Sequence, residues 1–197
     1  MKKNNIAYIA KIAVLGAVSA ILMLLEFPLP FAPEFYKLDL SESIVLIAGF
    51  SMGPLAAVLT EFVKILLNLL INGTITAGVG ELANFCIGVA FVLPAALIYK
   101  YKKTFMTALA GMLVGSVSLL IIGALINYYI MIPAYSKFII PMETIINMGN
   151  AVNPEIDSLW TLVRFATIPF NLLKGAICSL IATLIYKRLS PILHKTY

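Results

Sequence analysis

The chain has 197 residues, of which 61% are hydrophobic and 12% are charged, with a net charge of +5 and a mean hydropathy of +1.01. Soluble domains contain about 25% charged residues, so this composition indicates an integral membrane protein, in which positive charge follows topology and does not indicate a nucleic-acid partner. The length leaves room for roughly five to seven helical spans and excludes an attached soluble catalytic or ATPase domain. We expect residues 1–197 to form one membrane-embedded domain.

Apolar runs predict an all-α bundle of six transmembrane helices. They cover residues 6–25, 41–52, 54–71, 81–99, 105–131 and 160–186. The short run 41–52 must cross if both basic termini and the basic loop 100–103 are to lie on one side. The positive-inside rule makes that side cytoplasmic. It then carries Lys2, Lys3, Lys11, Lys100, Lys102, Lys103, Lys187, Arg188 and Lys195, opposite Glu26, Glu34, Asp39, Glu42, Glu143, Glu155 and Asp157.

Small residues recur along the first predicted span. Ala10, Ala13, Ala17 and Ala20 follow one another at spacings of three and four, with Gly16 beside them. Such a stripe lets another helix approach closely. Two interpretations remain open, packing within the bundle and docking of a partner protein.

The loop 26–42 combines prolines with aromatic residues. Pro28, Pro30 and Pro33 rule out a continuous helix. Aromatic and aliphatic side chains around them favour a structured extracellular cap that folds onto the bundle. The alternative is an aromatic belt at the lipid surface.

Polar residues lie inside the middle spans. Glu61, Lys64 and Asn68 share one helical face, and we expect Glu61 and Lys64 to pair and to face inward. Asn84 lies just inside the outer end of the fourth span, and Asn127 lies near the far end of the fifth. A polar, proline-bearing loop is expected at 133–159.

The last span carries Asn171 and Lys174 well inside an apolar run. A count along the helix puts the Cα of Lys174 roughly 18 Å from the inner border of a core about 30 Å thick. Ionisable groups at such depth usually face a bundle interior or a wet cavity and mark functional sites. The alternative is an internal lysine–carboxylate pair that only holds helices together.

The same count brings these polar groups together in the outer half of the bundle, beneath the loop 26–42. We expect a cavity there that opens outward and holds a small molecule. Asparagine offers both a donor and an acceptor, and aromatic side chains suit a planar ligand.

Catalytic and metal-binding patterns are missing from the sequence. The one histidine, His194, is in the C-terminal tail, and no phosphate-binding Gly-x-x-x-x-Gly-Lys motif occurs. Cys86 and Cys178 lie in apolar runs and indicate packing rather than a disulfide or a metal site. We therefore expect no enzyme, no metal and no cofactor. No paired halves are evident, which argues against a self-sufficient secondary transporter.

Several segments resemble the riboflavin-specific substrate-binding (S) component of energy-coupling factor (ECF) transporters. They are EFPLPFAP (26–33), LDLSE (38–42), GPL (53–55), EFVKILLN (61–68), GELANF (80–85), NYY (127–129), IPAY (132–135) and PFNLLKG (169–175). The resemblance implies a bacterial, multi-pass protein of the cell membrane that captures riboflavin outside. It also implies a transmembrane coupling protein and two cytoplasmic ATPases as partners, with flavin mononucleotide (FMN) as a second candidate ligand.

The resemblance also assigns roles to residues. Ala13 and Ala17 match the contact for the coupling protein, and Asn127, Asn171 and Lys174 match flavin-contacting positions. Glu42 departs from an expected aspartate. The predicted ligand-binding set is Asn171, Lys174, Asn127, Asn84, Leu38, Asp39, Leu40, Glu61, Lys64 and Asn68. The rival hypothesis is an ion- or proton-coupled transporter with Glu61 and Lys64 as its relay.

Overall fold

The computed structural model describes residues 3–193, so Lys2, His194 and Lys195 of the sequence analysis lie outside it. Its helices are α1 (Lys3–Leu24), α2 (Ser41–Met52), α3 (Pro54–Asn72), α4 (Val79–Tyr101), α5 (Phe105–Ile126), α6 (Ile132–Phe138), α7 (Met142–Val152), α8 (Leu159–Leu162) and α9 (Ile168–Leu193). Two π-helical turns, η1 (Asn127–Met131) and η2 (Val163–Thr167), continue α5 into α6 and α8 into α9. Strands β1 (Phe27–Pro28) and β2 (Lys37–Leu38) form a short hairpin between α1 and α2.

Within the described residues, five stretches are long and apolar enough to cross a membrane. They are Ile6–Leu24, Pro54–Asn72, Val79–Tyr101, Phe105–Phe138 and Leu159–Tyr186. The sixth predicted span, α2, is a buried apolar helix of 12 residues. At about 1.5 Å per residue it is shorter than a hydrocarbon core of about 30 Å.

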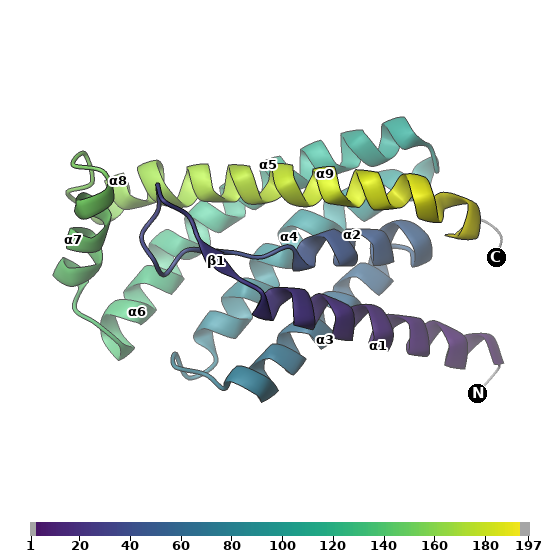
Figure 1. The fold of residues 1–197 in the computed structure, drawn as a ribbon, viewed down its shortest axis with the longest axis horizontal. Coiled ribbons are helices and arrows are strands. Elements are labelled where there is room, and N and C mark those ends of the chain that lie inside the picture. The colour runs from purple at the N-terminus through teal and green to yellow at the C-terminus, as the bar shows by residue number, and fades with distance from the viewer. Residues whose placement is uncertain (1–2, 194–197) are drawn as a thin grey trace.

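The two ends of the bundle differ in character. In Figure 1 the N- and C-terminal ends of the chain lie together on the right, and α7, α8 and the hairpin lie toward the left. A cavity of about 220 Å³ is lined by Tyr8 of α1, by Lys100 in the last turn of α4 and by Lys103 just after it. The basic segment 100–103 therefore lies at the end that holds the N-terminus.

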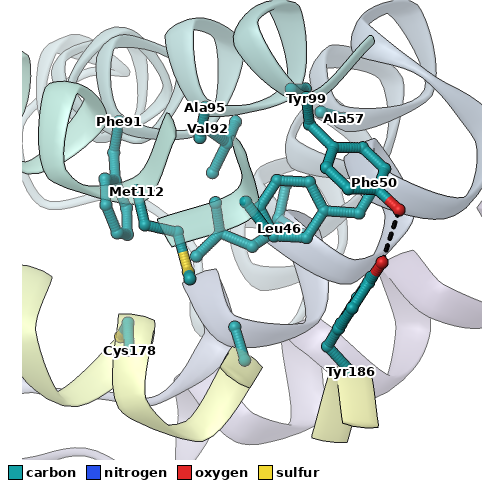
Figure 2. Packing of buried hydrophobic residues seen from close by; sticks show 14 of the residues in the cluster. Leu46, Phe50, Ala57, Phe91, Val92, Ala95, Tyr99, Met112, Cys178 and Tyr186 are labelled. Carbon is teal, nitrogen blue, oxygen red and sulfur yellow. Dashed lines mark hydrogen bonds between the residues drawn. The ribbon is translucent and has the colours of Figure 1, made fainter. Parts of the chain in front are cut away.

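Close helix packing builds the core near that end. Two glycines of α5 lie directly against backbone atoms of α4. At one of them, Gly115, an added Cβ would lie 2.3 Å from the Phe91 carbonyl oxygen, so no larger residue fits there. Such small residues let membrane helices approach each other. Figure 2 shows the neighbouring cluster, in which the hydroxyl groups of Tyr99 and Tyr186 lie 2.6 Å apart and join α4 to α9.

The alanine stripe of α1 is divided between two environments. Gly16 faces α3, where an added Cβ would lie 2.5 Å from a methyl group of Val63, and Ala20 is buried. Ala13 is exposed and Ala17 is half-buried. The stripe therefore packs within the bundle at one edge and leaves its other edge open.

The expectation of a loop at 133–159 is wrong. The fifth span continues through η1 and α6 to Phe138, and α7 follows after Pro141. Pro133 does not end the helix because it lies in the first turn of α6, where proline is tolerated, and because the π-helical turn before it changes the hydrogen-bonding pattern. Helix α7 buries Ile145 and Gly149 against the bundle.

Candidate functional site

The hairpin of β1 and β2 packs onto the bundle as a cap. Its antiparallel pairs are Phe27 with Leu38 and Pro28 with Lys37. The aromatic ring of Tyr36 lies 5.2 Å from that of Phe170, centroid to centroid. In Figure 1 the loop of the hairpin lies against the beginning of the last long helix. This arrangement favours the predicted cap over a lipid-surface belt.

The Tyr36 hydroxyl anchors the cap to two helices. It hydrogen-bonds the hydroxyl of Thr167 at 2.5 Å and donates to Oδ1 of Asn127 at 3.3 Å. Burial raises the pKa of Tyr36 above its ordinary value, so the phenol stays protonated at neutral pH. The cap is thus held by a neutral hydrogen-bond network next to aromatic packing.

A cavity of about 520 Å³ lies beneath this cap, within the size range of about 300–1,000 Å³ that is usual for small-molecule sites. Residues from α1, the hairpin, α2, α3, α4, the α5–α6 helix, α7 and α9 line it. Its polar lining comprises Glu26, Tyr36, Lys37, Asp39, Glu42, Lys64, Asn68, Asn72, Glu81, Asn84, Asn127, Tyr135, Asn171 and Lys174. Apolar side chains, including Phe35, Met131, Ile132 and Phe170, form the remaining walls.

Most of the predicted ligand-binding residues converge on this cavity. Those that line it are Asn68, Asn84, Asn127, Asn171, Asp39, Lys64 and Lys174. The structure places three others away from its wall. Leu38 is 1% exposed and packs in the apolar cluster under the cap, Leu40 precedes α2, and Glu61 is buried beside Lys64.

An ion-pair network forms the polar floor of the cavity. The Lys174 ammonium lies 2.8 Å from Asp39 and 3.9 Å from Glu42. The Lys64 ammonium lies 2.8 Å from Glu42 and 2.7 Å from Glu61. Glu61 and Lys64 therefore pair and face inward, as predicted. The network links the cap, α2, α3 and α9. It therefore holds helices together, as the alternative interpretation of Lys174 expects, and it also borders the cavity.

Asp39 connects this network to the start of α2. Its Oδ1 accepts hydrogen bonds from the backbone N–H of Ser41, at 2.9 Å, and from the Ser41 hydroxyl, while Oδ2 accepts from Lys174. The ammonium group of Lys174 and these hydrogen bonds surround the carboxylate of Asp39 with donors, which favours its ionised form.

Two buried asparagines differ in how fully they are hydrogen-bonded. Asn127 donates from Nδ2 to the Gly123 carbonyl at 2.8 Å and accepts from Tyr36. Asn171 is 5% exposed, and its Nδ2 has no hydrogen-bond partner among the described residues. A Cβ at Gly123 would lie 2.4 Å from this nitrogen, so the glycine makes room for it. Because an unpaired buried donor is costly, Asn171 is suited to donate to a ligand acceptor.

The π-helical turns flank this region. η1 begins at Asn127 and η2 ends at Thr167, and Pro133 and Pro169 follow them. Proline lacks the N–H that an α-helical turn would use, which accounts for the changed hydrogen bonding nearby. π-helical turns of this kind are frequent at functional sites.

Sequence reasoning left several residues of the site out of the predicted ligand-binding set, among them Glu42 and Tyr36. The sequence marks Glu42 only as an outer-side carboxylate that departs from an expected aspartate, although it contacts both lysines. Tyr36 is one of several aromatic residues of the cap, and its partners in η1 and η2 are more than 90 positions away in the sequence. No local spacing identifies such contacts.

Most of the chain matches one protein family. Residues 7–186 match the family model "ECF transporter, substrate-specific component". The riboflavin transporter RibU of Staphylococcus aureus (strain TCH60) is 32% identical over 93% of this chain and 90% of its own length. The riboflavin transporter FmnP of Bacillus subtilis (strain 168) is 30% identical over 91% and 90%.

A solved structure supports the same assignment. It is described as "Structure and mechanism of the S component of a bacterial ECF transporter", with a TM-score of 0.76 and 30% identity over 96% of this chain and 98% of that one. These comparisons confirm the family resemblance, and the family is one of transport components and not of enzymes. The chain belongs to the substrate-specific components of ECF transporters.

Proposed function

We propose that the protein captures riboflavin on the outer side of the bacterial cell membrane and delivers it to an ECF coupling protein with two cytoplasmic ATPases. The observation that carries this proposal is the cavity of about 520 Å³, onto which most of the predicted ligand-binding residues converge. Two relatives that cover nearly all of the chain are named riboflavin transporters.

The lining of the cavity suits a flat ligand with polar edges. Phe35, Tyr135 and Phe170 offer aromatic surfaces, which pack well against a planar ring system. The unpaired Nδ2 of Asn171 would donate to a ring carbonyl. Asn68 and Asn84 would hydrogen-bond the hydroxyl groups of a ribityl chain, since each amide both donates and accepts.

The proposed topology has six crossings with both termini in the cytoplasm. α2 would complete the sixth crossing together with the buried loop that precedes it, because Leu38 and Asp39 lie within the bundle. The grouping of Lys100 and Lys103 with α1 at one end supports this orientation through the positive-inside rule.

The open edge of the α1 stripe is the proposed contact for the coupling protein. Ala13 is exposed and Ala17 is half-buried, so a partner helix would meet small side chains there. The sequence contains no phosphate-binding loop, and the proposal therefore assigns ATP hydrolysis to the partner ATPases.

Riboflavin titration of the purified full chain tests the proposal. Quenching of flavin fluorescence would show saturable binding, and the protein would retain the visible absorption of bound flavin after purification. Uptake in cells would fail when ATP is depleted and would persist when an uncoupler removes the proton gradient. Uptake that collapses with the uncoupler and ignores ATP depletion would instead support the rival transporter with Glu61 and Lys64 as its relay.

A further inference from the structure

We propose that the cavity selects a ligand without a phosphate group, and that Glu26 and Glu81 are specificity-determining residues that repel phosphorylated flavin. The proposal rests on riboflavin as the ligand and concerns which member of the flavin class the site prefers. It does not depend on which end of the ligand enters first.

Each lysine that lines the cavity already has a carboxylate partner. Lys37 lies 2.7 Å from Glu26, and Lys64 lies 2.8 Å from Glu42. Lys174 lies 2.8 Å from Asp39. A phosphate group carries about −1.5 to −2 charges at neutral pH and binds tightly only where donors and positive charge are available. In this cavity it would compete with carboxylates for every ammonium group.

Negative charge is in excess along the lining. Four carboxylates, Glu26, Asp39, Glu42 and Glu81, stand against the three lysines Lys37, Lys64 and Lys174. No arginine lines the cavity among the described residues. A neutral ligand with hydroxyl and carbonyl groups avoids this repulsion, whereas an anionic one meets it in either orientation.

The excess is concentrated in the accessible part of the lining. Glu26 and Lys37 belong to the hairpin and are 39% and 47% exposed at their side chains. Glu81, at the start of α4, accepts a hydrogen bond from Thr74 at 3.0 Å and has no ion-pair partner among the described residues. Lys37 is held by Glu26, whose hydrogen bond raises the pKa of the ammonium. The accessible carboxylates therefore outnumber the accessible lysine.

The test compares riboflavin and FMN on the purified full chain, with the ratio of the two dissociation constants as the measured quantity. In the variant carrying both Glu26→Gln and Glu81→Gln, the glutamine oxygens can still accept from Lys37 and Thr74. FMN affinity relative to riboflavin should rise roughly threefold to tenfold, the scale of exposed charge pairs acting on a phosphate. The gain should shrink in high salt.

Two further variants sharpen the comparison. Lys37→Met removes the accessible cation and should lower the relative FMN affinity, a change of opposite sign. Glu34→Gln removes a carboxylate from the same hairpin loop at an exposed position outside the cavity, and should leave the ratio unchanged.

The outcomes separate this inference from the proposed function. An unchanged ratio in the double variant, or an equal change in Glu34→Gln, would overturn the role of Glu26 and Glu81 while riboflavin binding stands. A wild-type protein that binds FMN more tightly than riboflavin would overturn the selection itself. Failure of the wild-type protein to bind either flavin would overturn the proposed function and this inference with it.

Discussion

The ammonium of Lys174 lies 2.8 Å from the carboxylate of Asp39, and this contact ties the last helix to the segment that enters α2 beneath the cap. The pair is largely buried, with side chains 16% and 7% exposed. Removing one partner of a buried pair leaves an uncompensated charge, which costs about 3–5 kcal/mol, whereas removing both can be nearly neutral. One lysine thus supports the structure and borders the site.

The first prediction concerns this pair. Asp39→Asn should lower the free energy of unfolding more than the double variant Asp39→Asn with Lys174→Met, because the double variant leaves no buried ammonium unpaired. Thermal unfolding of both single variants and of the double variant in detergent measures the losses. Additive losses would show that the two groups do not interact.

The second prediction concerns the fit between α4 and the ion-pair network. A Cβ at Gly88 would lie 2.1 Å from Oε1 of Glu61 and 3.2 Å from Oε1 of Glu42. Gly88→Ala should therefore displace Glu61 and destabilise the protein by about 1–3 kcal/mol, the usual cost of overpacking. Cys86→Ala on the same helix, at an exposed position, serves as the control and should be close to neutral. Equal melting temperatures for the two variants would show that the network tolerates the methyl group.

These two sites also show how far sequence reasoning reaches. The pairing of Glu61 with Lys64 follows from their spacing of three on one helix, and the long spans follow from hydropathy. The contact of Glu42 with Lys64 joins two helices, so local spacing does not predict it. The polar, proline-bearing sequence of 133–159 predicts a loop and misses the helices there, because the place of Pro133 in a first turn is compatible with helix.

The third prediction concerns the hydroxyl that holds the cap. Tyr36→Phe keeps the ring packed on Phe170 and removes the hydrogen bonds to Thr167 and Asn127. Loss of about 1 kcal/mol should speed riboflavin dissociation roughly fivefold and change association less, because a lid acts mainly on escape. Stopped-flow fluorescence measures both rates.

A second variant and a control accompany this measurement. Shortening residues 30–36 should accelerate dissociation further. Tyr101→Phe, at a position 91% exposed at the opposite end of α4 from the cavity residue Asn84, should leave both rates unchanged. Identical dissociation rates in wild type and Tyr36→Phe would exclude the hydroxyl as a latch.

The fourth prediction concerns the partner surface on α1. Ala13→Trp should abolish ATP-dependent riboflavin uptake and leave the affinity of the isolated protein nearly intact, because Ala13 is exposed and does not line the cavity. A bulky side chain there would keep a partner helix at a distance. Ala17→Trp should act in the same direction, although its half-buried position adds a cost in stability.

The control places the same bulk on another helix. Ala176 is exposed on α9, and Ala176→Trp should preserve uptake. Loss of binding together with uptake in Ala13→Trp would mean that the stripe packs inside the bundle. Normal uptake in that variant would place the coupling protein on a different face.

The most direct test of riboflavin capture in this cavity is the affinity of Asn171→Leu. The Nδ2 group of Asn171 has no protein partner among the described residues, so its removal breaks no protein hydrogen bond of this group and should not lower the melting temperature of the ligand-free protein. If the group donates to bound riboflavin, the variant should bind about 1–3 kcal/mol more weakly, roughly 5- to 150-fold, because a ligand acceptor is left unpaired. Flavin fluorescence quenching on wild type and variant supplies the measurement. Wild-type affinity in a folded Asn171→Leu protein would contradict the placement of riboflavin in this cavity.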